Sequence, residues 1–66
     1  MTDLNKSVLE FIKKYTELHS EPPGLRIIAD KFEWKSNTSA YKQVRILVRE
    51  GHLKKLPSGR HFPLSK

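Results

Sequence analysis

The stretch from Ser36 to Gly51, SNTSAYKQVRILVREG, constrains the fold more than any other part of this 66-residue chain. Its apolar side chains recur at the i, i+4, i+7 and i+8 spacing of one helical face: Ala40, Val44, Leu47 and Val48. A second face carries polar, aromatic and cationic side chains: Thr38, Tyr41, Lys42, Arg45 and Arg49. Ser36 can cap the N-terminus of this helix, and Gly51 can end it in a left-handed turn. The rest of the chain must therefore cover the apolar face and leave the basic face outward.

Two further helices are predicted before this stretch. Apolar residues at steps of three and four predict a helix from about residue 3 to 19: Leu4, Val8, Phe11, Ile12, Tyr15 and Leu18. Thr2 or Asp3 is its expected N-cap. The helix must stop before Pro22 and Pro23, because proline lacks an N–H and restricts the preceding residue. A short second helix is then expected at about 25–33, and the basic helix at about 37–50.

A β-hairpin is predicted after the basic helix. Two short extended runs, at about 53–56 and 61–64, flank a turn at Pro57–Arg60. Strands of this length are marginal alone, so we expect them to pack on the helices through Leu53, Phe62 and Leu64. The predicted fold class is α+β, with three helices followed by a two-stranded hairpin in a single domain over residues 1–66.

Positive charge is concentrated in the second half of the chain. Residues 34–66 carry eight lysines and arginines against one acid, whereas residues 1–33 carry five against six acids. A one-sided field of this kind suits a polyanion, either nucleic acid or an anionic membrane surface. The basic helix keeps no apolar face free once it is folded, so the pattern favours double-stranded DNA over a membrane.

Several classes of function are not expected. The chain has no cysteine, no apolar run of about 20 residues and no signal peptide, which indicates a cytoplasmic protein. Its three histidines lack the spacing of a metal site, and no phosphate-binding loop or catalytic triad is recognisable. So small a core cannot enclose a substrate pocket of roughly 300–1,000 Å³. We expect no enzymatic activity, cofactor, metal ion or small-molecule ligand.

The order of the predicted elements is that of a winged helix-turn-helix domain. The residues that carry a closer resemblance run from the proline turn to the hairpin: Pro22, Pro23, Gly24, Ile28, Ala29, Phe32, Trp34, Ser36, Val44, Leu47 and 49–53. In this order they resemble the DNA-binding domain of the LexA repressor family. The resemblance implies a sequence-specific DNA-binding protein, a small transcriptional regulator. It would read the major groove with helix 37–50. The predicted hairpin, which is the basic wing of such a domain, would lie against the DNA backbone or minor groove.

The candidate DNA-binding residues lie in the basic helix, in the turn before it and in the wing. They are Lys35, Ser36, Asn37, Thr38, Ser39, Tyr41, Lys42, Arg45, Arg49, Lys54, Lys55 and Arg60. Arg45 is the best candidate for a bidentate guanine contact, and Arg49 should favour phosphate. Residues at the start of the helix can meet phosphate or base edges through side chains and backbone N–H groups.

The chain departs from the family pattern at several positions. Gly24 stands where the family has a serine or threonine cap, Ile27 where it has glutamate, and Glu33 where it has glycine. The residues expected to face DNA also differ, so we expect the fold to carry over and the DNA site to change. Nothing in these residues corresponds to the family's self-cleaving second domain, with its catalytic serine and lysine.

A protein-interaction or architectural module, of the excisionase or replication-accessory type, is the alternative. A basic winged helix can dock on an acidic partner. Apolar residues with no evident core role can also mark a homodimer surface, and here they are Leu25, Ile27 and Ile46.

Overall fold

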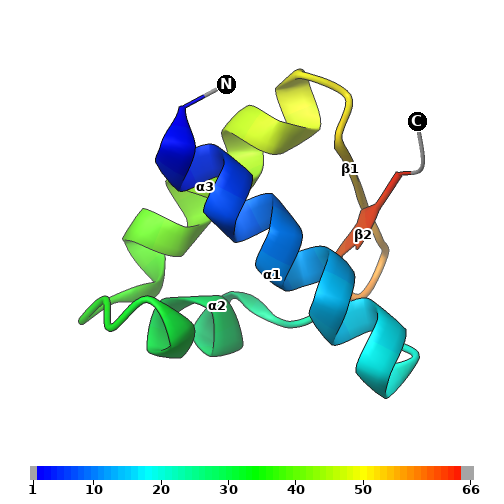
Figure 1. Cartoon of the computed structure of the whole chain (residues 1–66), viewed down its shortest axis with the longest axis horizontal. Coiled ribbons are helices and arrows are strands. Elements are labelled where there is room, and N and C mark those ends of the chain that lie inside the picture. The colour runs from blue at the N-terminus through cyan, green and yellow to red at the C-terminus, as the bar shows by residue number, and fades with distance from the viewer. Residues whose placement is uncertain (1, 65–66) are drawn as a thin grey trace.

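The computed structural model describes residues 2–64, which form three helices followed by a two-stranded antiparallel sheet (Figure 1). The elements are α1 (Asp3–His19), α2 (Leu25–Lys31), α3 (Asn37–Arg49), β1 (Leu53–Lys55) and β2 (His61–Pro63). The predicted α+β class, with three helices and a hairpin, is confirmed. No helix within residues 2–64 is long and apolar enough to span a membrane.

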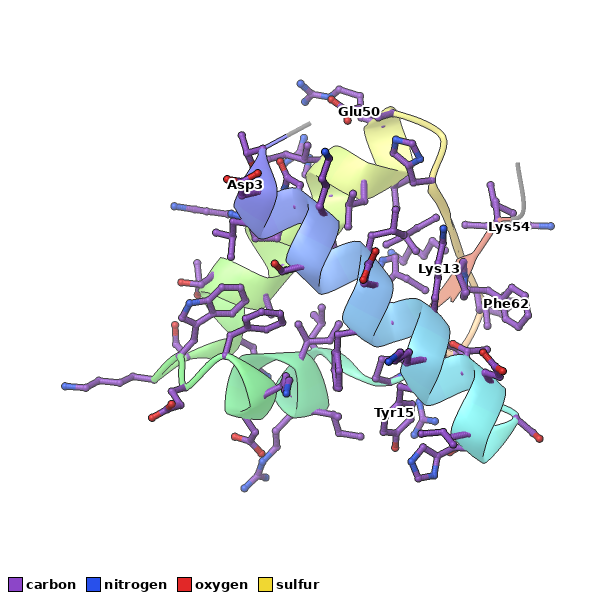
Figure 2. All side chains as sticks on the ribbon, in the orientation of Figure 1. Asp3, Lys13, Tyr15, Glu50, Lys54 and Phe62 are labelled. Atoms are coloured by element: carbon purple, nitrogen blue, oxygen red, sulfur yellow. The ribbon has the colours of Figure 1, made fainter. Side chains whose placement is uncertain are left out.

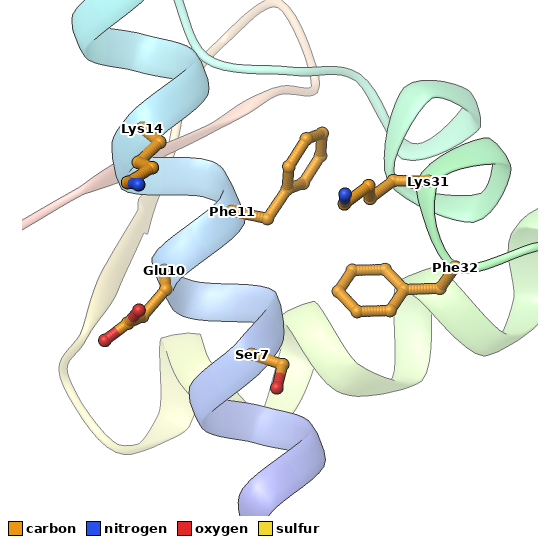
Figure 3. Close-up of a pocket in the computed structure, with 6 residues that line it drawn as sticks. All are labelled: Ser7, Glu10, Phe11, Lys14, Lys31 and Phe32. Carbon is orange, nitrogen blue, oxygen red and sulfur yellow. The ribbon is translucent and has the colours of Figure 1, made fainter.

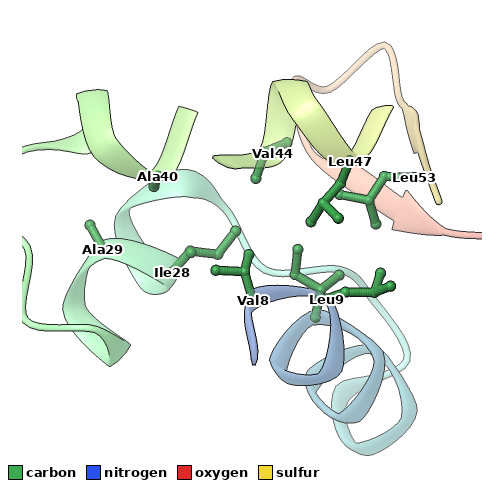
Figure 4. Close-up of a cluster of buried hydrophobic side chains, with 9 residues drawn as sticks. Val8, Leu9, Ile28, Ala29, Ala40, Val44, Leu47 and Leu53 are labelled. Atoms are coloured by element: carbon green, nitrogen blue, oxygen red, sulfur yellow. The ribbon is translucent and has the colours of Figure 1, made fainter. Parts of the chain in front are cut away.

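The core lies where the three helices meet β1 (Figure 4). Its buried side chains are Val8, Leu9, Ile12, Ile28, Ala29, Ala40, Val44, Leu47 and Leu53. Each large aliphatic side chain buried in this way contributes about 1.5–3 kcal/mol. The apolar stripe of the basic helix is buried as predicted, with Val48 half-buried at its margin. Burial of this stripe fixes which face of α3 is turned to solvent.

Helix α1 begins at the Thr2 cap, whose hydroxyl accepts a hydrogen bond from the Asn5 N–H at 3.1 Å. The predicted core positions at the two ends of this helix are wrong. Leu4 is 40% exposed and Leu18 is 79% exposed, whereas Leu9 is buried. Leu18 belongs to the last turn of α1, which Figure 1 shows projecting past α2 and the hairpin, and its side chain therefore stays exposed.

Helix α2 ends at Lys31, two residues before the predicted end, because Glu33 adopts a left-handed conformation with φ of 58°. The Glu33 N–H donates to the Asp30 carbonyl at 3.2 Å, and the Trp34 N–H donates to the Ala29 carbonyl at 2.8 Å. These two bonds form a Schellman motif, which satisfies the last carbonyls of the helix. Trp34 then packs at the core margin, with its ring stacked on Phe32 at a centroid distance of 5.0 Å.

Replacing Glu33 with glycine should stabilise the fold by about 0.5–1 kcal/mol. A side chain in the left-handed region costs about 1–2 kcal/mol, and part of this gain is offset by the greater freedom of glycine in the unfolded chain. Thermal denaturation should show the melting temperature of Glu33→Gly raised by about 2–8 °C. Gly51→Ala makes the opposite change, because it adds a side chain at a backbone φ of 83°, and it should lower the melting temperature. An unchanged or lowered melting temperature for Glu33→Gly would contradict this account.

Gly51 ends α3 as predicted, in a left-handed turn of the same kind. Its N–H donates to the Val48 carbonyl at 3.1 Å, and the His52 N–H donates to the Leu47 carbonyl at 2.9 Å. The chain therefore turns over the three residues 50–52 and then enters β1.

The pairing register of the hairpin corrects the predicted packing of its strands. Leu53 pairs with Pro63, Lys54 with Phe62 and Lys55 with His61. Because side chains alternate across a strand, Leu53 and His61 share the core face while Phe62 is on the outer face. Phe62 is accordingly 41% exposed, and Leu64 is 36% exposed. Leu53 packs as expected, but buried His61 takes the place that was predicted for Phe62 and Leu64.

Acid should destabilise the fold through His61. Burial lowers the pKa of His61 below its ordinary value of 6.5, and the positive charge of Lys55 lowers it further. As the pH falls below about 6.5, the unfolded chain therefore takes up this proton before the folded protein does, and folding becomes less favourable. Urea denaturation at pH 7.5 and 5.5 should show a smaller loss of stability for His61→Gln than for the wild type. Equal losses in the two proteins would contradict the assignment.

Candidate nucleic-acid interface

The outward face of α3 gathers most of the predicted DNA-binding residues. Ala40, Val44 and Leu47 point into the core, so the other side of the helix is presented to solvent. The predicted contact residues of α3 are all exposed: Asn37, Thr38, Ser39, Tyr41, Lys42, Arg45 and Arg49. The structure therefore brings these side chains onto one accessible helix, as the sequence pattern predicts.

Within residues 2–64, the cations of this face form no ion pair with an acid. Among residues 2–64, the pairs within 4.0 Å are Arg60 with Glu21 and His52 with Glu50. Lys42, Arg45 and Arg49 take part in neither. A polyanion that approaches α3 therefore has no internal ion pair to break before it meets these charges.

The N-terminus of α3 is open to an anion. Ser36 occupies the cap position with extended backbone, at φ of −135° and ψ of 161°, but its hydroxyl makes no capping hydrogen bond. The predicted cap position is therefore right, and the expected side-chain bond is not formed. The first N–H groups of a helix carry partial positive charge and need partners, and Lys35 is exposed beside them.

A partly buried polar pair that sequence reasoning missed, Asn5 and Gln43, joins α3 to α1. The Asn5 side chain is 4% exposed, and its amide donates to the Gln43 side-chain oxygen. The Thr2 hydroxyl donates to the Asn5 side-chain oxygen at 2.7 Å. The sequence spacing could have indicated that Gln43 faces the core, because it lies three residues after Ala40 and four before Leu47, on the apolar stripe of the helix. Gln43 therefore helps to fix the rotation that turns Lys42 and Arg45 outward.

The hairpin, or wing, contributes two exposed lysines and one arginine that is hydrogen-bonded to other residues of the protein. Lys54 is directly opposite Phe62 on the outer face of the hairpin, and both project from it in Figure 2. Lys55 is also exposed. Arg60 differs, because its guanidinium donates to the Glu21 carboxylate at 3.0 Å and to the Pro22 carbonyl at 3.3 Å. Arg60 thus ties the turn of the hairpin to the proline loop between α1 and α2.

The apolar residues proposed for a partner surface differ in exposure. Leu25 is partly buried against the core, so the expectation that it lacks a core role is wrong. Ile27 is half-buried on α2, and Ile46 is 37% exposed on α3.

The three histidines lie in different parts of the fold: His19 at the end of α1, His52 between α3 and β1, and His61 in β2. The His19 ring packs on Tyr15 at a centroid distance of 4.1 Å, His52 is 4.0 Å from Glu50, and His61 is buried in β2. In the part of the chain that the structure describes, no three histidine, aspartate or glutamate side chains gather in a way that could hold a metal ion.

Comparison with known proteins relates the chain to one family. Residues 1–60 match the family model described as the LexA DNA binding domain. A LexA repressor of Petrotoga mobilis (strain DSM 10674 / SJ95) is 34% identical over 55 residues, which is 83% of this chain and 27% of the repressor. A LexA repressor of Limosilactobacillus fermentum (strain NBRC 3956 / LMG 18251) is 33% identical over 57 residues, 86% of this chain and 27% of that protein. The chain thus spans about a quarter of the length of these curated relatives.

Proposed function

Because this chain belongs to the LexA DNA-binding domain family, we propose that it is a sequence-specific double-stranded DNA-binding protein that acts in transcription regulation. The observation that carries the proposal is the outward face of α3, where Lys42, Arg45 and Arg49 are exposed and have no acid partner within residues 2–64. A helix with one buried face and one basic face fits the width of the major groove.

The proposed contacts divide into those that read bases and those that position the protein. Arg45, near the middle of α3, can donate two hydrogen bonds to a guanine edge, which is worth about 1–3 kcal/mol of discrimination. Thr38, Tyr41 and Lys42 share its face and complete the reading set. Arg49 lies one turn further on and contacts phosphate. Phosphate contacts fix register without carrying sequence information.

The start of α3 supplies a second set of phosphate contacts. The backbone N–H groups there lack a capping bond from Ser36, and they point toward an approaching anion. Lys35, Asn37 and Ser39 surround this end of the helix and are exposed. A phosphate bound at this position would complete the N-terminal cap that Ser36 leaves unmade.

The wing is proposed to rest on the DNA backbone or in the minor groove through Lys54 and Lys55. Support comes from their exposure and from the lack of an acid partner for either one within residues 2–64. The sequence predicts the same role for Arg60. Its bonds to Glu21 and Pro22 support a second task, which is to hold the hairpin at a fixed angle while the lysines make contact.

Selection from a random duplex library tests the proposal. We expect enrichment of one motif that contains a guanine for Arg45, and a binding constant that falls steeply as salt rises. The logarithmic salt slope is about −0.9 per phosphate neutralised, so it should become shallower by about one for each phosphate contact removed. A palindromic motif would indicate two bound copies, for which Ile27 and Ile46 are the proposed apolar contacts. No enrichment over the input library would overturn sequence-specific binding.

A further inference from the structure

An open hollow of about 310 Å³ lies between α1 and α2, apart from every residue that is assigned to DNA (Figure 3). Its lining residues are Ser7, Glu10, Phe11, Lys14, Lys31 and Phe32. They come from α1 and from the end of α2, and none belongs to α3 or the hairpin. A ligand here would therefore leave the proposed reading face uncovered.

The apolar part of the hollow is made by two aromatic rings. Phe11 and Phe32 meet edge to face with ring centroids 6.1 Å apart, and both are half-buried against the core. Because both rings are only partly covered by the core, a part of each remains in contact with water. A large apolar side chain that packs over the exposed parts of both rings would gain aromatic contact and cover this surface.

The charged part of the hollow is mainly cationic. Figure 3 shows Lys14 on α1 and Lys31 at the end of α2, with the Phe11 ring between them and the Phe32 ring beside the Lys31 side chain. Neither lysine has an acid within 4.0 Å among residues 2–64, and the one acid of the lining, Glu10, is paired with neither. The Lys31 ammonium is 5.9 Å from the centroid of the Phe11 ring. A partner that carries carboxylates on both sides of an apolar group matches this arrangement.

We propose that this hollow docks an acidic segment of a partner protein, which packs one large apolar side chain over the exposed parts of the Phe11 and Phe32 rings and places carboxylates beside Lys14 and Lys31. A segment fits better than a small molecule, because small-ligand sites bury about 70–90% of the ligand and this hollow is open to solvent. It also fits better than the sugar-phosphate backbone of nucleic acid, because the apolar Phe11 ring lies between the two cations. One anchoring side chain with charges around it is a common basis for weak, transient contacts.

This docking does not depend on the proposed function, because the two sites share no residue. Protein that is bound to DNA through α3 keeps the hollow accessible. The partner could therefore bind the protein both on DNA and in solution. A regulator that recruits a second protein to DNA needs a docking site of this kind.

A short fluorescein-labelled peptide with aspartates on both sides of one tryptophan tests the proposal by fluorescence anisotropy. The Lys14→Glu/Lys31→Glu variant should bind this peptide at least about tenfold more weakly than the wild type, since two favourable charge pairs become repulsive. Lys6→Glu/Lys13→Glu is the matched control, because it makes the same charge change on exposed α1 residues outside the hollow, and it should bind within about threefold of the wild type. A peptide with alanine in place of tryptophan should lose about tenfold or more.

Amide chemical shifts locate the bound peptide. We expect changes at Ser7 and Phe32, and none on the outward face of α3. Equal losses in the two charge variants, or shifts confined to α3, would show adventitious binding of acid to the basic face and overturn the proposal. Equally tight binding of free indole acetate would overturn the assignment to a protein segment. In sedimentation experiments without the peptide, we expect the wild-type chain to stay monomeric. Self-association that the Lys14→Glu/Lys31→Glu variant abolishes would mean that a second copy of the chain occupies the hollow, and would overturn the proposal.

Discussion

Replacing Lys42 and Arg45 together with glutamate should reduce affinity for the selected DNA duplex by at least about 100-fold while leaving the fold intact. The guanine contact proposed for Arg45 is worth about 1–3 kcal/mol, and each new carboxylate adds repulsion from the phosphates. Both side chains are exposed and make no ion pair within residues 2–64, so their loss removes nothing that holds the fold together. Gel shifts at about 50 mM salt would measure the affinity, and circular dichroism would confirm the fold.

The control for this experiment is Lys6→Glu/Lys13→Glu, which makes the same change in net charge on α1. We expect its affinity for DNA to stay within about fivefold of the wild type, because these lysines lie outside the proposed contacts and act only through the general field. Equal losses in the two variants would mean that net charge alone governs binding. Unchanged affinity of Lys42→Glu/Arg45→Glu would show that α3 does not read DNA.

Truncating Leu47 to alanine should cost about 2–5 kcal/mol of folding free energy. Leu47 is fully buried, and it lies with Val8, Leu9 and Leu53 where α1, α3 and the hairpin meet (Figure 4). A domain of this length has a total stability of roughly 3–10 kcal/mol, so this cavity removes a large part of it. Urea denaturation should show a much lower midpoint, and the melting temperature should fall by at least about 10 °C.

The neighbouring Ile46 supplies the matched control, since it is 37% exposed on the same helix. Ile46→Ala should cost less than about 1 kcal/mol, and alanine also has the higher helix propensity. Similar losses at both positions would mean that α3 is rotated relative to the core from the orientation described above. Such a rotation would also move Lys42 and Arg45 away from the outward face, so this pair of variants tests the geometry on which the DNA-binding proposal rests.

Much of α3 was predictable because its information is local. The steps between Ala40, Val44 and Leu47 identify the buried face, and the cations then fall on the other face by helical geometry alone. Gly51 marks the end of the helix for the same reason, because few other residues tolerate its left-handed backbone. Both features depend only on residues within a few positions of each other.

Features that join distant parts of the chain were not predictable in this way. Asn5 and Gln43 are 38 residues apart, and Glu21 and Arg60 are 39 apart. Either pair could be proposed only after the helices had been packed together. The hollow between α1 and α2 has the same origin, since Phe11 and Phe32 meet only in the tertiary structure.

The sequence by itself determined the element order, the two faces of α3 and the family to which the chain is similar, because periodicity, turn residues and motif spacing are local properties. The tertiary structure alone decided that His61 is buried rather than Phe62, that Leu18 is exposed and that Arg60 is held by Glu21. The physical reason is that burial depends on what lies opposite a side chain. A shift of one residue in strand register exchanges the buried and exposed faces of a strand. Where an amphipathic helix extends beyond the elements that pack on it, its apolar face remains exposed.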